Sequence, residues 1–174
     1  GTVVSINRGE RRRILEIIIK ADGKEQREEY KPTHPDGLGR DEIIQKLLEA
    51  GLWPFLRQRP YGIIAKPGDK PKAIFISAFD TSPLGPDLDF VVTGEEKNFQ
   101  TGIDAIKKLT DGKVHFNVDS TYPASSVFTK ANNVQVNRFK GPHPAGNVGI
   151  QIHHLDPLAK GEIIWYLAPQ DIIT

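Results

Sequence analysis

The chain has 174 residues, a length that suits one ordinary domain, or one domain with part of a second. Its content of 38% hydrophobic and 26% charged residues excludes a disordered or fibrous chain, and 23 basic against 22 acidic residues exclude a strongly basic nucleic-acid-binding domain. No apolar run approaches the roughly 20 residues that cross a bilayer, and the absence of cysteine excludes disulfides, thiolate metal sites and cysteine nucleophiles.

Residues 1–30 are expected to form a β-hairpin. Two segments rich in β-branched residues, Thr2–Ile6 and Ile14–Ile19, flank a stretch of turn-forming residues. A run of three arginines, residues 11–13, lies between the two segments. Two interpretations of this run stay open: a solvated end of the hairpin, or a patch that docks on an acidic partner.

Residues 31–71 are expected to be a connector that holds one helix and one aromatic-rich segment. Apolar residues recur at helical spacing in Arg40–Ala50, and Gly51 is well placed as the cap of that helix. The next segment, Leu52–Tyr61, mixes three aromatic residues with two arginines, and its prolines argue against regular structure. Such a segment either pins itself onto a core or stacks a planar ligand.

Residues 72–174 alternate between strand and helix patterns. A helical pattern between the first two strands ends at Gly112, a short helix is expected in Ser120–Lys130, and a last strand is expected to begin at Asp171. The order predicts a parallel sheet with flanking helices and right-handed crossovers, a Rossmann-like α/β domain. The other expected strands are Ala73–Ala78, Lys113–Val118, Val134–Phe139 and Ile163–Leu167.

Two loops are expected at the carboxyl ends of these strands, where ligands bind in sheets of this kind. Phe79–Asp87 is rich in side-chain oxygens, and it either holds a ligand hydroxyl or a cation, or forms an Asx turn that satisfies its own backbone. Gly141–Gly149 allows close backbone approach and precedes a helix expected near Ala145, whose free N–H groups would face an anion. The phosphate signal is weak, because neither G-x-G-x-x-G nor a P-loop is present.

Three histidines, His143, His153 and His154, lie near Asp156. A metal site or proton relay is one interpretation, and helix capping or hydrogen-bonded packing is the other. Neighbouring positions on a helix point about 100° apart, so His153 and His154 do not easily share a metal ion. We therefore expect no metal site, and the residues alone assign no reaction.

Four segments, taken together in this order, resemble one family: the A subunit of the bacterial Na⁺-translocating NADH:quinone reductase (Nqr). The similarity extends over nearly the whole chain. Because the chain starts with glycine and contains no methionine, we expect it to be excised from a longer protein, and the resemblance implies a central part of that protein. The segments are Gly1–Gly9, Gly51–Pro60, Ala78–Leu84, and Gly141–Gly146 with the following His153 and Leu155–Pro157.

The resemblance implies a fold similar to the flavin-binding domain of the NADH-binding subunit of respiratory complex I, preceded by a hairpin from a lipoyl-like, barrel-sandwich region. It implies a place on the cytoplasmic face of the bacterial inner membrane, with the other subunits of the complex as partners, above all the membrane-embedded quinone-reducing subunit. The complex couples NADH oxidation and quinone reduction to sodium export. Its flavins and iron–sulfur cluster are on other subunits, so this part is expected to bind no cofactor and not to be catalytic by itself.

The resemblance also implies candidate residues. The family is associated with quinone binding, and a nucleotide loop inherited from the fold would be vestigial because Pro142 and Pro144 remove backbone donors. Two alternatives remain: a redox domain that binds FMN or NADH, and a module that only docks subunits. The quinone candidates are Trp53, Phe55, Phe79 and His143; the vestigial-loop candidates are Asp80, Thr81, Gly141, Gly146 and Gly149; the docking candidates are Arg11, Arg12, Arg13, Arg57 and Arg59.

Overall fold

The computed structural model of the chain describes residues 1–24, 26–27, 29–123 and 126–174. The chain divides into two units, residues 1–32 and residues 33–174. The sequence suggests residues 31–71 as a connector, and residues 33–71 of this segment supply a helix and two strands to the second unit.

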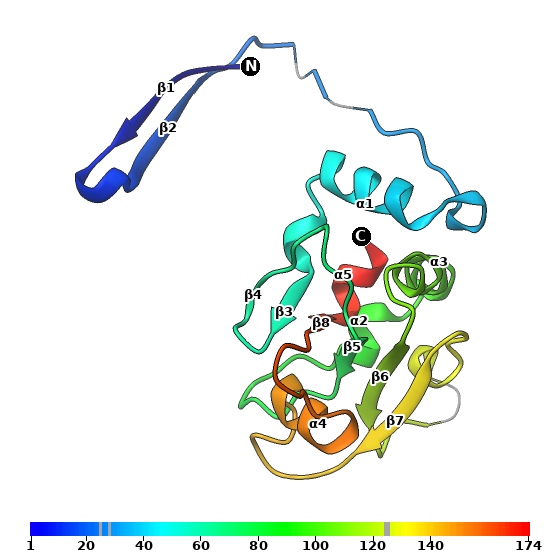
Figure 1. The fold of residues 1–174 in the computed structure, drawn as a ribbon. Helices are drawn as coiled ribbons and strands as arrows, with labels where there is room; N and C mark the ends of the chain where they lie inside the picture. Colours follow the sequence, from blue (N-terminus) through cyan, green and yellow to red (C-terminus); the bar gives the residue numbers. More distant parts are fainter. Residues whose placement is uncertain (25, 28, 124–125) are drawn as a thin grey trace. The chain divides into compact units, whose positions relative to one another are not determined.

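The first unit is the expected β-hairpin. Strands β1 (Thr2–Arg8) and β2 (Ile14–Lys20) pair antiparallel, with a 3₁₀ turn, η1 (Glu10–Arg12), between them (Figure 1). Arg11 and Arg12 of this turn adopt positive φ angles of 53° and 63°. A two-stranded hairpin buries little surface, and large apolar side chains of both strands remain 44–64% exposed.

The second unit contains a six-stranded sheet in the order β4-β3-β8-β5-β6-β7. Four strands lie close to where the sequence predicts them, and they pair in parallel. The sheet as a whole is mixed, so the prediction of a parallel sheet is wrong at one edge: β3 pairs antiparallel with β8, and β4 pairs antiparallel with β3. The strands are β3 (Arg57–Arg59), β4 (Ile63–Ile64), β5 (Ala73–Ala78), β6 (Lys113–Asp119), β7 (Gln135–Phe139) and β8 (Ile164–Leu167).

The extra edge strand comes from the segment that was expected to be irregular. Pro54 and Pro60 lie on either side of β3, so the three residues of this strand keep their backbone N–H groups. Proline therefore limits the length of this strand without preventing it.

Five helices accompany the sheet in the part of the chain that the structure describes. Helix α1 agrees with the prediction, and Gly51 follows it with a φ of +71°. Helix α4 begins three residues later than expected, and the segment expected to begin a strand at Asp171 is instead α5, which opens with a proline and an Ala168 N–H bond to the Asp171 carboxylate. The helices are α1 (Arg40–Glu49), α2 (Leu88–Val92), α3 (Glu96–Lys107), α4 (Val148–Leu155) and α5 (Pro169–Ile173).

The described residues of this unit also form three 3₁₀ turns: η2 (Pro35–Gly37), η3 (Trp53–Phe55) and η4 (Val127–Thr129). The short helix predicted in Ser120–Lys130 is represented, among the described residues, by η4 alone. Residues 124 and 125 of that prediction lie outside the described residues.

Helices cover both faces of the sheet, as the apolar run of β5 predicts (Figure 1). Ile74 and Ile76 belong to the large core, which also contains buried residues of α1, α2, α3 and α5. Ala73 and Phe75, which alternate with them, pack with Val148 and other residues of α4 in a smaller core on the other face. The unit is therefore an α/β layer structure with a mixed central sheet.

Gly112 was expected to cap helix α3, and this expectation is wrong. The helix ends at Lys107, and its cap residue is Lys108. Gly112 lies directly before β6, where a Cβ atom would lie 1.8 Å from the Lys72 carbonyl oxygen. Glycine is required here because two backbone segments approach closely.

Candidate functional site

A cavity of about 600 Å³ lies beyond the carboxyl ends of β5 and β8. From β5 the chain continues to β6 and β7 on one side, and it returns to β8 on the other side. Ligands bind at such a reversal of strand order in open α/β sheets. We call this space the polar cavity; its lining includes Phe55, Arg57, Arg59, Ser77, Phe79, Asp80, Gly146, Asn147, Val148, Tyr166, Leu167, Gln170 and Asp171.

The two loops predicted at the strand ends meet at this cavity. The Gly146 N–H donates to the Thr81 hydroxyl at 3.0 Å, and that hydroxyl lies 3.3 Å from the His143 Nδ1. A Cβ atom on Gly146 would lie 2.5 Å from the Thr81 backbone nitrogen, so this glycine permits the close approach of the loops. Gly149 is exposed with open space around it, and neither it nor Gly141 lines the cavity.

Asp80 forms the Asx turn that was one of the two interpretations of its loop. Its carboxylate accepts a hydrogen bond from the Ser82 N–H at 2.8 Å. That bond to the charged form lowers the pKa of Asp80. The carboxylate therefore stays ionised beside the cavity, with one oxygen committed to its own turn.

Two of the five docking candidates, Arg57 and Arg59, line the polar cavity from strand β3. Arg57 donates to the Gly62 carbonyl, and the Arg59 guanidinium lies 5.2 Å from the centre of the Tyr166 ring. The other three, Arg11, Arg12 and Arg13, belong to the hairpin unit and are exposed.

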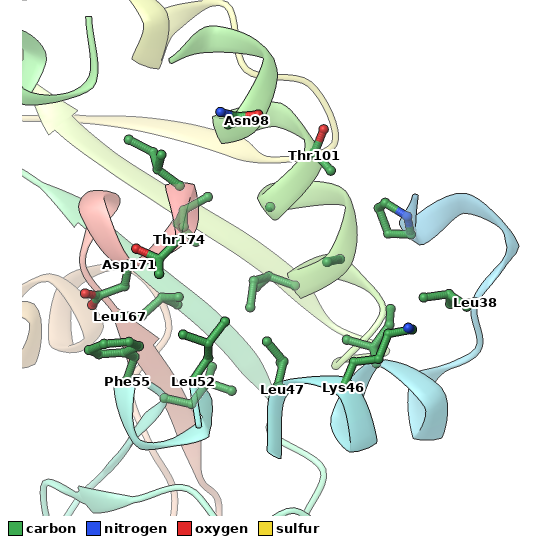
Figure 2. Close-up of a pocket in the computed structure, with 18 of the residues that line it drawn as sticks. Leu38, Lys46, Leu47, Leu52, Phe55, Asn98, Thr101, Leu167, Asp171 and Thr174 are labelled. Atoms are coloured by element: carbon green, nitrogen blue, oxygen red, sulfur yellow. The ribbon is translucent and has the colours of Figure 1, made fainter. Parts of the chain in front are cut away.

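A second cavity, of about 260 Å³, lies among α1, η3, α3 and α5, and we call it the apolar cavity (Figure 2). Its polar groups are few: Lys46 of α1, Asn98 and Thr101 of α3, and Asp171 of α5 are among them. Burial raises the pKa of the Asp171 carboxyl, which accepts the Ala168 N–H at 2.9 Å. The apolar lining includes Leu38, Leu47, Leu52, Phe55, Ala105, Ile106, Leu167 and Ile172.

The four quinone candidates do not form one site. Phe55 lines both cavities, whereas Phe79 lines the polar cavity and stacks on Phe139. Trp53 is only 4% exposed and lines neither cavity, and its indole N–H donates to the Ala65 carbonyl at 2.7 Å. His143 is exposed and lines neither.

A buried polar network between the sheet and α4 was missed by sequence reasoning. Gln151 of α4 is fully buried; it accepts from the Asn117 amide at 2.8 Å and donates to the Ser77 hydroxyl at 2.9 Å. Asn137 donates to Asn117 and lies 3.3 Å from the Nδ1 of His115. The chain of contacts thus leads from His115 to Ser77, which lines the polar cavity. The alternation of β6 predicts a strand, but it does not indicate that the polar residues His115 and Asn117 are buried.

The burial of His115 predicts how the free energy of unfolding of the chain depends on pH. Burial lowers its pKa below the ordinary value of 6.5, and its Nε2 has no hydrogen-bond partner among the described residues. Below about pH 6.5 the unfolded chain takes up a proton that the folded chain resists, so the free energy of unfolding falls as the pH drops from there toward the folded pKa. His115→Gln should flatten this loss in urea unfolding between about pH 7.5 and pH 5. The exposed control, His153→Gln, should retain it; equal pH dependence of wild type and His115→Gln would contradict the prediction.

Metal and membrane features are absent from the described residues. Within residues 1–24, 26–27, 29–123 and 126–174, no three side chains of His, Asp or Glu are grouped so that they could hold a metal ion. His153 and His154 are both exposed, and Asp156 pairs with Lys72 at 2.7 Å. Among the same residues, no helix has the length and apolar character needed to span a membrane.

Comparison with known proteins gives a consistent result. Residues 38–174 match the family model described as the NqrA second alpha/beta domain. The whole chain is 40% identical to the A subunit of the Na(+)-translocating NADH-quinone reductase of Yersinia pseudotuberculosis serotype O:1b (strain IP 31758). It is 39% identical to the same subunit of Photorhabdus laumondii subsp. laumondii. Each match covers 100% of this chain and 39% of the relative, so the chain spans well under half the length of these proteins.

Proposed function

This chain belongs to the NqrA second α/β domain family, and from that premise we propose that it is a central part of the A subunit of a Na⁺-translocating NADH-quinone reductase. The identity of 40% over the whole chain supports this assignment. The parent complex couples NADH oxidation and quinone reduction to sodium export. This part has a structural role in the complex and contains a ligand cavity. The groups that transfer electrons are on other subunits.

The finer fold assignment follows from the order of the strands. The four parallel strands lie in the order β7-β6-β5-β8, which corresponds to the 3-2-1-4 order of a Rossmann-like half and supports that relation. Residues 1–30 are the remnant of a lipoyl-like region. Exposed apolar side chains on β1 and β2 support this view, because a hairpin of this kind needs further strands to cover it.

The partners are the other subunits of the complex, including the membrane-embedded subunit that reduces quinone, and the location is the cytoplasmic face of the inner membrane. Arg11, Arg12 and Arg13 provide a docking patch on the hairpin. All three are exposed, and the turn that carries them includes two residues with positive φ, which supports a defined shape for this patch.

The apolar cavity is the site of a quinone ring. A quinone needs an apolar slot with one or two hydrogen-bond donors for its carbonyl oxygens. Phe55 supplies an aromatic wall, and the Lys46 ammonium, which donates to the Thr33 hydroxyl at 3.2 Å, carries further N–H groups for a carbonyl. The observation that carries this proposal is that a polar group of this kind lies beside a predominantly apolar lining (Figure 2).

The test is isothermal titration calorimetry of the full-length protein with ubiquinone-1. Ala105 lines the apolar cavity from α3, so Ala105→Phe fills the space and should lower the affinity for ubiquinone-1 by about 10-fold or more. Ala159→Phe is the matched control, because Ala159 is exposed and lines neither cavity. It should leave the affinity unchanged.

A second variant tests the quinone proposal if Ala105→Phe does not fold. Phe55 is 44% exposed, so Phe55→Ala should keep the fold while it removes the aromatic wall, with a severalfold loss of affinity. The proposal is wrong if ubiquinone-1 binds equally well to the wild type and to every folded cavity variant, or if the full-length protein does not bind it.

A further inference from the structure

We propose that the polar cavity binds the phosphate group of a small organic phosphate ester, in a site separate from that of the quinone. Two guanidinium groups that pair with no described carboxylate, the start of helix α4 and a volume larger than a phosphate ion together carry this inference. It does not depend on the quinone proposal, because its principal residues, Arg57 and Arg59, do not line the apolar cavity.

The arginines are held on the cavity side of the sheet. In β3 they alternate with Gln58, which is buried and accepts the indole N–H of Trp165 at 3.3 Å on the opposite face. In the part of the chain that the structure describes, neither Arg57 nor Arg59 forms an ion pair with a carboxylate, and the buried Nε of Arg59 has no hydrogen-bond partner there. Guanidinium groups bind phosphate through paired N–H donors, so these two are suited to an anion.

Helix α4 adds a second source of positive potential. It has eight residues, it begins at Val148, and both Val148 and the cap residue Asn147 line the cavity. The Asn147 side chain does not cap the helix. The Ile150 N–H donates to the Asn147 carbonyl at 2.9 Å, but the N–H groups of Val148 and Gly149 have no partner among the described residues. Gly146, which lies just before the cap residue and also lines the cavity, presents no side chain there.

Two carboxylates also line the cavity, and they oppose an anion. Asp80 faces the Ser82 N–H of its own turn, and Asp171 faces the Ala168 N–H at the start of α5. Each is therefore held by a backbone donor, and neither pairs with an arginine among the described residues. The remaining repulsion between Asp171 and an anion provides a second test. Asp171→Asn should strengthen anion binding, because it removes a negative charge while its amide oxygen still accepts the Ala168 N–H.

The size of the cavity favours an ester over the free ion. At about 600 Å³ it lies within the range that holds drug-sized molecules. Phe55, Phe79 and Tyr166 provide apolar and aromatic surface beside the arginines. An organic group attached to the phosphate would contact this surface, and a bare phosphate ion would leave it empty.

The experiment is calorimetric titration of the full-length protein with AMP, adenosine and inorganic phosphate as probes. AMP should bind, adenosine should bind at least about 10-fold more weakly, and inorganic phosphate should also bind more weakly than AMP. Arg59→Gln should lower the AMP affinity by about 10-fold or more and leave the adenosine affinity unchanged. Lys97→Gln is the matched control, because it removes a positive charge from an exposed position that lines neither cavity.

Further variants keep the proposal testable if Arg59→Gln does not fold. Arg57 is exposed, so Arg57→Gln should fold and weaken AMP binding, and Asp171→Asn should strengthen it. Ala105→Phe should leave AMP binding unchanged, which separates this site from the quinone site. The proposal is overturned if neither AMP nor phosphate binds, if AMP and adenosine bind equally well, if phosphate binds as tightly as AMP, or if no folded arginine variant weakens AMP binding.

Discussion

Gly112→Ala is expected to destabilise the folded chain by about 3 kcal/mol or more. The new Cβ atom would lie 1.8 Å from the Lys72 carbonyl oxygen, and both atoms belong to backbone that leads into neighbouring strands of the core. Relief of this contact requires movement of the start of β5 or β6, two strands in which most side chains are buried. Equilibrium urea unfolding measures the loss as a lower midpoint with an unchanged slope.

Gly68→Ala is the matched control for this prediction. Gly68 is exposed, it does not have a positive φ, and no heavy atom outside its neighbours in the chain lies within 4 Å of the position that its Cβ would take. Its substitution should change the free energy of unfolding by less than about 0.5 kcal/mol. Equal stability of the two variants would show that the contact at Gly112 relaxes at no cost, and the prediction would be wrong.

Gln151→Leu is expected to lower the free energy of unfolding by about 3 kcal/mol. The substitution removes the acceptor of the Asn117 amide and the donor to the Ser77 hydroxyl, and it leaves these groups without those partners beneath α4. Leucine is similar in size to glutamine, so the loss reports the unpaired polar groups and not a cavity.

The control for the network is Gln45→Leu, the same change on the exposed side of α1. The Gln45 side chain donates to Glu49 at 2.8 Å, and loss of this bond should matter by less than about 0.5 kcal/mol. Urea unfolding of both variants provides the comparison. If Gln151→Leu were as stable as Gln45→Leu, an apolar contact would replace the polar network without loss, and the assigned role of the network would be refuted.

The sequence predicted the parallel part of the fold because the signals there are local. The apolar run of β5 and the helical spacing before β6 each lie within one element, so periodicity alone identifies them. The edge strand β3 was missed because its three residues are too few to show a period. Helix α5 was missed because its isoleucines suggested a strand, whereas Pro169 and the cap bond to Asp171 start a helix.

The candidate site was predictable only in part, for a similar reason. Parallel topology places the loops after β5 and β7 at one edge, which is why Asp80 and Gly146 lie at the same cavity. The apolar cavity arises where α1, α3 and α5 pack together, and nothing within any one of them signals it. The place of Arg57 and Arg59 depends on a strand that the sequence did not predict.

Three side chains, those of Phe55, Leu167 and Asp171, form a partition with one cavity on each side. A molecule on one side and a molecule on the other touch the same wall from opposite directions. If an occupant of one cavity shifts this wall and changes the affinity of the other cavity for its ligand, that second ligand changes the affinity of the first by the same factor, because linkage between two binding equilibria is reciprocal. Any coupling between the two cavities therefore passes through these three side chains, and Ala105 is not one of them.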